Sequence, residues 1–380
     1  MDKIKVLIAS DSFKGSASSK EINNAIEKGL RRGSEQVDTI KIPIADGGEG
    51  TIEAIIENCG GEIKSLKLKS ALGDNKEIKY GLFKDKETVV IETAETLGIA
   101  RLRKDQLDPY KNTSESLGEL IRYLLDQEIR KFFVGLGGSA TNDCGYGMLK
   151  ALGVKFLDKE SKEITGDICE LEQLDRIDLS SLDERIIESE FILLADVKNS
   201  LCGEEGATYT YGPQKGLKKE DLERYDKILC NIGGQLEKAL NESFLGKSST
   251  GAAGGLGAAF IGPLHAKTEK GIDKILELIC FEEHLDGVDL IVTGEGKMDE
   301  QSIYGKTPMG ILKVGKKKKI PVAAIVGSIG EGVEAVYEEG ISLVISAVTK
   351  PQTLEQAIEN TIENVEKAGF QLIKAFTIKT

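Results

Sequence analysis

Apart from the carboxylates, the sequence has few of the residues that commonly serve as metal ligands or catalytic bases. It contains only two histidines, His265 and His284, and six cysteines scattered without a C-x-x-C pair or a Cys/His cluster. A zinc site and a disulfide framework are therefore not expected, and the thiols are predicted to be reduced. Neither histidine lies in the glycine-rich segments described below, so carboxylates are the available bases.

Long apolar runs and an excess of positive charge are also missing. The nearest approach to a membrane span, Gly251–Gly262, is short and rich in glycine. The net charge of −13 repels nucleic acid and anionic membrane surfaces. The first residues lead directly into an apolar run and leave no room for a signal peptide. We therefore expect a cytoplasmic protein that binds neither nucleic acid nor membranes, and that holds any anionic ligand through local backbone amides and a few lysines.

Apolar runs at the two ends of the chain predict one parallel sheet. They are typical of strands buried on both faces, and they comprise Ile4–Ala9, Thr39–Ile44, Asp289–Thr293, Pro321–Val326 and Ile341–Val348. Ser18 and Glu21 have the spacing of a capping box before a helix. Thr307 and Pro308 are predicted to cap and start another helix.

The middle of the chain has a different texture. Ile78–Phe83 and Thr88–Thr93 alternate like an antiparallel pair, and further strands alternate with helices. The predicted fold is α/β: a doubly wound, flavodoxin- or Rossmann-like parallel sheet formed by residues 1–72 and 287–380, with a mixed α/β domain of residues 73–286 inserted into it.

Four glycine-rich segments follow predicted strands. They are Asp11–Ser16 (DSFKGS), Ala45–Thr51 (ADGGEGT), Gly135–Asp143 (GLGGSATND) and Thr293–Ser302 (TGEGKMDEQS). Glycine allows close backbone approach, and a following helix start presents free N–H groups to an anion. One such loop is weak evidence, but four that also carry Asp, Lys, Ser and Thr indicate a phosphate-binding site.

Phosphoryl transfer needs cations for the phosphates, carboxylates for Mg²⁺ and a base near the acceptor hydroxyl. Lys14 and Lys306 are the best placed cations. Asp46, Asp196 and Asp299 are the best placed carboxylates, because each follows an apolar strand. The simpler interpretation of each residue is a surface or loop-shaping role.

Two other nucleotide-binding motifs match the sequence in part. Gly305, Lys306 and Thr307 match the end of a P-loop, but Glu300 occupies the position of its first glycine. Gly135, Gly137 and Ala140, with Asp158 about 20 residues later, match a dinucleotide-binding fingerprint. This match keeps an NAD-dependent dehydrogenase of a small hydroxy acid as an alternative, and a non-catalytic sensor of organic acids is a second one.

The chain resembles the bacterial glycerate kinase family in a series of ordered blocks. These are ASDSFKGS, PIADGGEGT, GLGGSATNDCGYGMLKALGVKF, ADVKNSLCG, YGPQKG, GAAGGLGAA and DLIVTGEGKMDEQSIYGKTPMG. The resemblance covers nearly the whole chain and implies a two-domain α/β enzyme that phosphorylates glycerate with ATP and Mg²⁺, with 2-phosphoglycerate slightly favoured as the product. We expect a monomer or a homodimer.

The site is predicted as follows. Asp196, Lys14 and Asp46 are the catalytic candidates, with Asp196 as the base, and Asp299 and Glu295 are the metal-binding candidates. The candidates for binding substrate or phosphate are Ser12, Gly47, Gly48, Gly137, Gly138, Ser139, Thr141, Asn142, Gly294, Gly296 and Lys306.

Overall fold

The computed structural model describes residues 3–69, 74–303 and 305–378. The chain divides into two compact units, the first formed by Met1–Asp46, Glu53–Gly60 and Ile272–Thr380, and the second by Gly47–Ile52 and Gly61–Gly271. The sequence predicted domain boundaries after residue 72 and after residue 286, and the boundaries between the two units lie elsewhere. One reason is that residues 61–69 form a strand that pairs within the second unit.

The sheet of the first unit is parallel throughout, as the apolar runs predict, and has the order β13-β12-β11-β1-β2. Its strands are β1 (Ile4–Ser10), β2 (Val37–Lys41), β11 (Leu290–Met298), β12 (Val322–Ile329) and β13 (Leu343–Ser346). From β1 the sheet is extended in one direction by β2 and in the other direction by β11, β12 and β13. In open parallel sheets, ligands bind beyond the carboxyl ends of the strands at such a change of direction.

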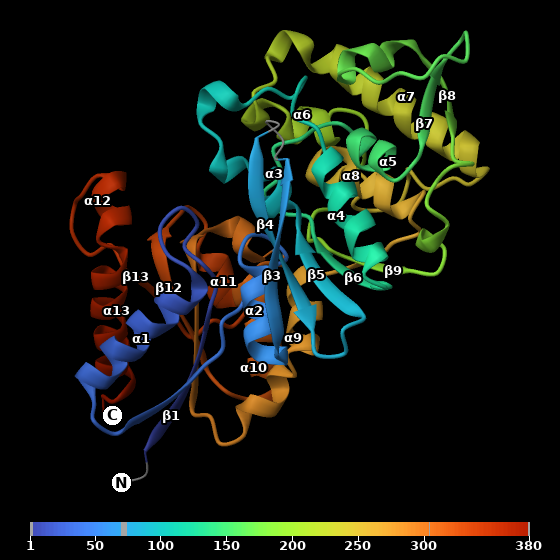
Figure 1. Cartoon of the computed structure of the whole chain (residues 1–380). Coiled ribbons are helices and arrows are strands. Elements are labelled where there is room, and N and C mark those ends of the chain that lie inside the picture. Colours follow the sequence, from blue (N-terminus) through green and yellow to red (C-terminus); the bar gives the residue numbers. More distant parts are fainter. Residues whose placement is uncertain (1–2, 70–73, 304, 379–380) are drawn as a thin grey trace. The chain divides into compact units, whose positions relative to one another are not determined.

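Seven helices lie in or at the edge of this unit in the described part of the chain. They are α1 (Ser19–Gly33), α2 (Thr51–Cys59), α9 (Gly271–Leu278), α10 (Thr307–Lys318), α11 (Glu334–Glu338), α12 (Leu354–Glu359) and α13 (Thr361–Phe376). Ser18 and Glu21 form the predicted capping box of α1. Helices α1 and α13 lie side by side (Figure 1), with Gly29 against the backbone of Glu366. They share one apolar cluster with β1, β11 and β12.

The second unit has a mixed six-stranded sheet in the order β10-β9-β6-β5-β4-β3 and a separate β7–β8 hairpin. Its strands are β3 (Gly61–Lys69), β4 (Asn75–Phe83), β5 (Thr88–Glu92), β6 (Lys131–Gly135), β7 (Lys155–Asp158), β8 (Leu174–Asp178), β9 (Glu190–Leu194) and β10 (Lys267–Glu269). The antiparallel pairing of β4 with β5 confirms the predicted alternation. Strand β3 was not predicted, because most of it is exposed and it carries few apolar residues.

The core of the second unit is one large apolar cluster between this sheet and its helices. The helices are α3 (Thr93–Leu97), α4 (Glu115–Asp126), α5 (Tyr146–Ala151), α6 (Ala207–Tyr211), α7 (Leu222–Leu240) and α8 (Ala252–Ile261). Helix α8 begins irregularly, since Ala253, Gly254 and Gly255 have left-handed backbone angles. In the described part of the chain, no helix is both long and apolar enough to cross a membrane.

Candidate functional site

The first glycine-rich segment is a tight turn directly after β1. Asp11 N–H donates to the carbonyl of Gly294 on the neighbouring strand at 3.0 Å, and Phe13 N–H donates to the carbonyl of Ala17 at 2.9 Å. The Phe13 side chain is buried in the core cluster. Lys14, next to it, keeps 66% of its side chain exposed. The turn therefore holds a lysine at the carboxyl end of β1, as predicted.

Asp11 lies in the same turn and was not among the predicted site residues. It is buried, and its carboxylate accepts hydrogen bonds from Ser12 N–H at 2.6 Å and from the Thr307 hydroxyl at 3.1 Å. Burial, reinforced by the nearby negative charge of Asp46, raises the pKa of Asp11 to about 8. Its position directly after a buried strand was the available signal. A carboxyl group that titrates near neutral pH is suited to proton transfer.

The hydrogen bond to Asp11 also corrects the prediction for α10. Thr307 is not the cap of this helix: Lys306 is, and Thr307 is the first helical residue. The Thr307 hydroxyl instead donates a hydrogen bond to the carboxylate of Asp11, which follows β1. Thr307 therefore makes a tertiary contact in place of the helix-capping hydrogen bond that the local sequence predicted.

The prediction that Thr293–Ser302 is a loop is wrong in its first half. Strand β11 continues through Met298, because Lys297 and Met298 still pair with β12. Gly294 therefore lies inside a strand, where a Cβ atom would collide with the carbonyl of Ile325 on β12. Glycine at this position allows β11 to pack closely against β12, and the predicted contact of Gly294 with substrate or phosphate stays a prediction.

Glu295 and Lys306 form an ion pair at the same edge of the sheet, with Nζ and Oε2 3.1 Å apart. Glu295 is buried and Lys306 is partly exposed. Burial raises the pKa of Glu295, and Lys306 counteracts this. The lysine predicted to bind phosphate thus already faces a carboxylate.

These side chains line a pocket of about 570 Å³ within the first unit, a volume typical of small-molecule sites. Its polar part contains the predicted residues Ser12, Lys14, Asp46, Glu295, Gly296 and Lys306, and also Asp11 and Lys297. Asp46 lies across from Lys14, with Oδ2 and Nζ 3.9 Å apart. The Ser12 hydroxyl is buried and has no hydrogen-bond partner among the described residues. Six of the predicted site residues therefore line one pocket, and their roles stay predictions.

Asp299 is not among the residues that line the pocket. Its carboxylate pairs with Lys297 at 2.8 Å and accepts a hydrogen bond from Gln301 N–H at 3.0 Å. The hydrogen bond from Lys297 lowers the pKa of Asp299, so the carboxylate is ionised near neutral pH.

In the second unit, two glycine-rich segments pack against each other. Gly137 N–H donates to the carbonyl of Gly47 at 3.4 Å, and a Cβ atom on Gly137 would lie 2.7 Å from Cα of Gly48. Gly138 follows with a positive φ of 74°. Glycine is needed at Gly137 because the two backbones approach within contact distance. The predicted residues of these two segments are therefore neighbours.

Lys215 lies beneath the Gly135–Asp143 segment and was not predicted. Its ammonium group is buried and donates to the Ser139 hydroxyl at 3.1 Å and to the Thr141 carbonyl at 2.6 Å. Burial lowers the pKa of Lys215 to about 7, although Asp143 opposes the shift. The sequence feature that could have pointed to Lys215 is its position in YGPQKG, one of the blocks that resemble the family.

Two polar atoms of the same segment are unusually placed. Thr141 Oγ1 and Asn142 Oδ1 are buried, and within the described part of the chain neither has a hydrogen-bond partner. The amide nitrogen of Asn142 donates to the Thr208 hydroxyl at 3.2 Å. Unpaired buried polar atoms are costly and typical of ligand sites. Both residues were predicted to bind substrate or phosphate.

Asp196 follows β9 in the second unit, as predicted from the sequence. It is partly buried, and its Oδ1 accepts a hydrogen bond from Gly271 N–H at 3.0 Å. This contact fixes one oxygen of the carboxylate.

The dinucleotide-binding interpretation of Gly135, Gly137 and Ala140 is wrong. Helix α5 begins only at Tyr146, so no helix starts within the glycine turn. Asp158 closes its own hairpin by accepting hydrogen bonds from Glu160 and Lys162 N–H. The fingerprint requires both the helix start and a free acidic side chain on the next strand.

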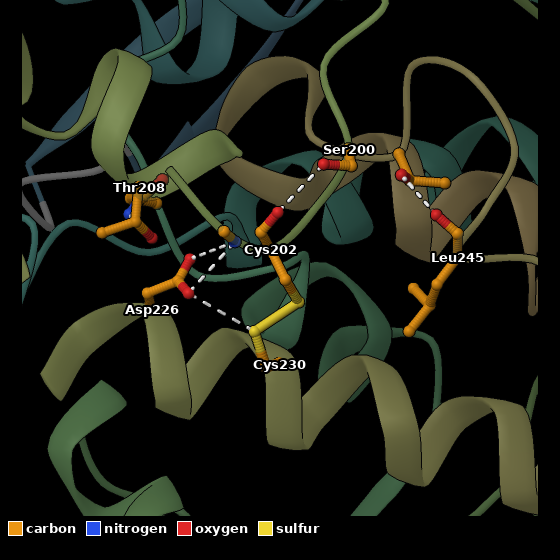
Figure 2. Close-up of a disulfide and its surroundings, with 9 residues drawn as sticks. Ser200, Cys202, Thr208, Asp226, Cys230 and Leu245 are labelled. Atoms are coloured by element: carbon orange, nitrogen blue, oxygen red, sulfur yellow. Dashed lines mark hydrogen bonds between the residues drawn. A yellow bond between two sulfur atoms is a disulfide. The ribbon is translucent and has the colours of Figure 1, made fainter. Parts of the chain in front are cut away.

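The expectation of reduced cysteines is contradicted at one pair. Cys202 and Cys230 form a disulfide across 28 positions, with Cα atoms 5.6 Å apart (Figure 2). Asp226 lies beside it and accepts a hydrogen bond from Gly203 N–H at 3.2 Å (Figure 2). The loop before α6 and helix α7 bring the two cysteines together, which spacing alone does not reveal. The other four cysteines are free.

No group of three or more His, Cys, Asp or Glu residues that could hold a metal ion is found in residues 3–69, 74–303 and 305–378. Mg²⁺ often uses only one or two carboxylates together with substrate phosphates, and the pocket of the first unit offers such carboxylates.

The sequence profile of the glycerate kinase family matches residues 6–377. A glycerate kinase of Halalkalibacterium halodurans is 39% identical over 96% of both chains. The glycerate 2-kinase of Escherichia coli is 36% identical over 99% of this chain and 98% of its own.

A solved structure has the same fold. The crystal structure described as glycerate kinase 2 from Salmonella typhimurium LT2 matches with a TM-score of 0.83 and 37% identity. The match covers 99% of this chain and 98% of that one.

Proposed function

The chain belongs to the glycerate kinase family, and from this premise we propose that it transfers the γ-phosphoryl group of ATP to glycerate. The observation that carries the proposal is the match to named glycerate kinases over nearly the full length of both chains. We favour the 2-hydroxyl as acceptor, because the Escherichia coli relative is named a glycerate 2-kinase.

The pocket of the first unit is proposed to hold the phosphates. Phosphoryl transfer depends on positioning and on charge stabilisation. Lys14 projects from a turn anchored by Phe13, so its ammonium group can meet the transferring phosphate. Lys306 can turn from Glu295 to a second phosphate oxygen, since its side chain is partly exposed. Ser12 and Gly296 line the same space.

Mg²⁺ would neutralise charge on the ATP phosphates. We propose Glu295 and Asp299 as its protein ligands, following the prediction from sequence. Glu295 lines the pocket, which supports its part in the proposal. Asp299 would first have to exchange its contact with Lys297.

Glycerate is proposed to be handled by the second unit. The buried and unpaired oxygens of Thr141 and Asn142 support this, and so does the packing of Gly47, Gly48 and Gly137. Asp196 is proposed as the base that takes the proton of the acceptor hydroxyl. Asp46, 3.9 Å from Lys14, and Asp11 both line the pocket of the first unit. The raised pKa of Asp11 makes it the second candidate for proton transfer.

We further propose that the second unit is a domain inserted into a flavodoxin-like, doubly wound first domain. The strand order of the first sheet, which is 2-1-3-4-5 in chain order, supports this. A monomer or a homodimer is proposed as the working form. The need for ATP supports a place in the cytoplasm.

The test is to incubate the purified protein with ATP, Mg²⁺ and D-glycerate and to measure ADP. Phosphorus NMR of the product, through coupling to the protons at C2 or C3, identifies the phosphorylated hydroxyl. Turnover of NAD(H) with a hydroxy acid, without ATP consumption, would refute the proposal. Binding of glycerate without any turnover would favour a sensor.

A further inference from the structure

The pocket of the first unit has an apolar end that phosphates do not need. Beyond the ends of β12 and β13 it is lined by Ala347, Val348, Leu354, Ala357 and Ile358. Leu354 is 72% exposed and Ile358 is 39% exposed. Large apolar side chains at the rim of a pocket that is charged elsewhere indicate a surface that a ligand covers.

A buried amide lies at this apolar end. Asn364 lines the pocket, is only 7% exposed, and its Nδ2 has no hydrogen-bond partner among the described residues. A buried amide donor without a partner destabilises the protein, because it has given up its hydrogen bonds to water without replacing them. A ligand in the pocket that accepts this hydrogen bond removes the cost.

The apolar end is held to the phosphate end by the first turn. Ser16 lies in the same turn as Lys14, and its hydroxyl hydrogen-bonds the Thr361 hydroxyl at the start of α13. Ser16 and Thr361 both line the pocket. One continuous space therefore offers lysines at one end and apolar walls with an amide at the other.

From these observations we propose that the apolar end of the pocket binds the adenine ring of the nucleotide. The ring lies against Val348, Leu354 and Ile358, and the amide of Asn364 bonds its edge. A flat heterocycle needs apolar contact on its faces, and an asparagine amide pairs with N6 and N7 of adenine. This rests on the proposed kinase function, which supplies the phosphates at the other end.

The chain contains no tryptophan, so one substitution provides a clean probe of this site. In Leu354→Trp, the single indole stands at the rim of the pocket, on an exposed position that tolerates the change. ADP should alter its fluorescence in a saturable manner, and tripolyphosphate alone should not. Ile362→Trp is the control, because Ile362 is 43% exposed but does not line the pocket.

Kinetics provide the second measurement. Ile358→Ser and Asn364→Leu should each raise KM for ATP about five- to tenfold and leave KM for glycerate unchanged. Ile362→Ser, with the same residue type and similar exposure only four positions away, should change neither constant. Circular dichroism of each variant checks that it is folded.

The outcomes separate this inference from the proposed function. If the wild-type protein phosphorylates glycerate but the Ile358 and Asn364 variants keep its KM for ATP, the adenine lies elsewhere and the inference is wrong. If the wild-type protein does not phosphorylate glycerate, the kinase proposal fails, and the Leu354→Trp titration with ADP still decides whether a nucleotide base binds here.

Discussion

Replacing Asp11 by asparagine should stabilise the protein above neutral pH while lowering its activity. Asn has nearly the same shape, and it can keep the hydrogen bond from Ser12 N–H and another with the Thr307 hydroxyl. What it removes is a negative charge buried near Asp46. The protein should lose this charge without losing the turn that carries Lys14.

The sign and size follow from the pKa of Asp11. Its pKa rises from 3.8 to about 8 on folding, so between these values the folded state holds a proton that the unfolded state has released. Stability from this group is complete below pH 3.8, falls as pH rises, and is fully lost above about pH 8. A shift of this size corresponds to on the order of 5 kcal/mol. We expect Asp11→Asn to recover at least ~2 kcal/mol of the free energy of unfolding at pH 9.

The assay is urea unfolding of the wild type and of Asp11→Asn at pH 6, 7, 8 and 9, followed by circular dichroism. The stability difference between the two should grow from pH 6 to about pH 8 and level off by pH 9. Asp299→Asn is the control, because contact with Lys297 lowers the pKa of Asp299. The contribution of Asp299 is lost only in acid, so its difference from wild type should stay constant from pH 6 to 9. A difference for Asp11→Asn that is equally constant would show that Asp11 ionises normally in the fold.

Three further predictions concern the site residues and the disulfide. Lys14→Ala should lower kcat at least tenfold and leave the urea midpoint nearly unchanged, since an exposed ion pair adds little stability; near-wild-type activity would reduce Lys14 to a surface residue. Asp196→Asn should lower kcat, and added Mg²⁺ should not restore it. Asp299→Asn should raise the Mg²⁺ concentration needed for half activity, and excess Mg²⁺ should restore the activity. The reverse pattern in a Mg²⁺ titration would make Asp299 the base and Asp196 the metal ligand. Dithiothreitol should lower the free energy of unfolding by about 3 kcal/mol through the loss of the Cys202–Cys230 loop closure, and Cys202→Ser should be insensitive to it; equal stability with and without reductant in the wild type would mean that the bond does not form in solution.

Local patterns in the sequence were sufficient for much of the first unit. The apolar runs predicted its five parallel strands, and the Ser18 capping box is present as expected. The turn with Lys14 lies at the carboxyl end of β1 as predicted, because a strand followed by a glycine turn is a short-range property of the chain. The ordered family blocks led to the family that the comparisons show.

Other features depend on which distant segments meet, and the sequence did not reveal them. The extension of β11 through Met298 depends on pairing with β12, and strand β3 on pairing with β4.

The chemistry of the site has the same dependence on tertiary contacts. The pKa of Asp11 depends on burial and on Asp46 35 positions away, and that of Lys215 on burial beneath another segment. Cys202 and Cys230 pair because a loop and a helix bring their Cα atoms within bonding range. The sequence by itself determined the family and the types of most elements of the first unit, since both depend on contiguous residues. Only the tertiary structure decided charge states and partners, because desolvation and contact are properties of the packed chain.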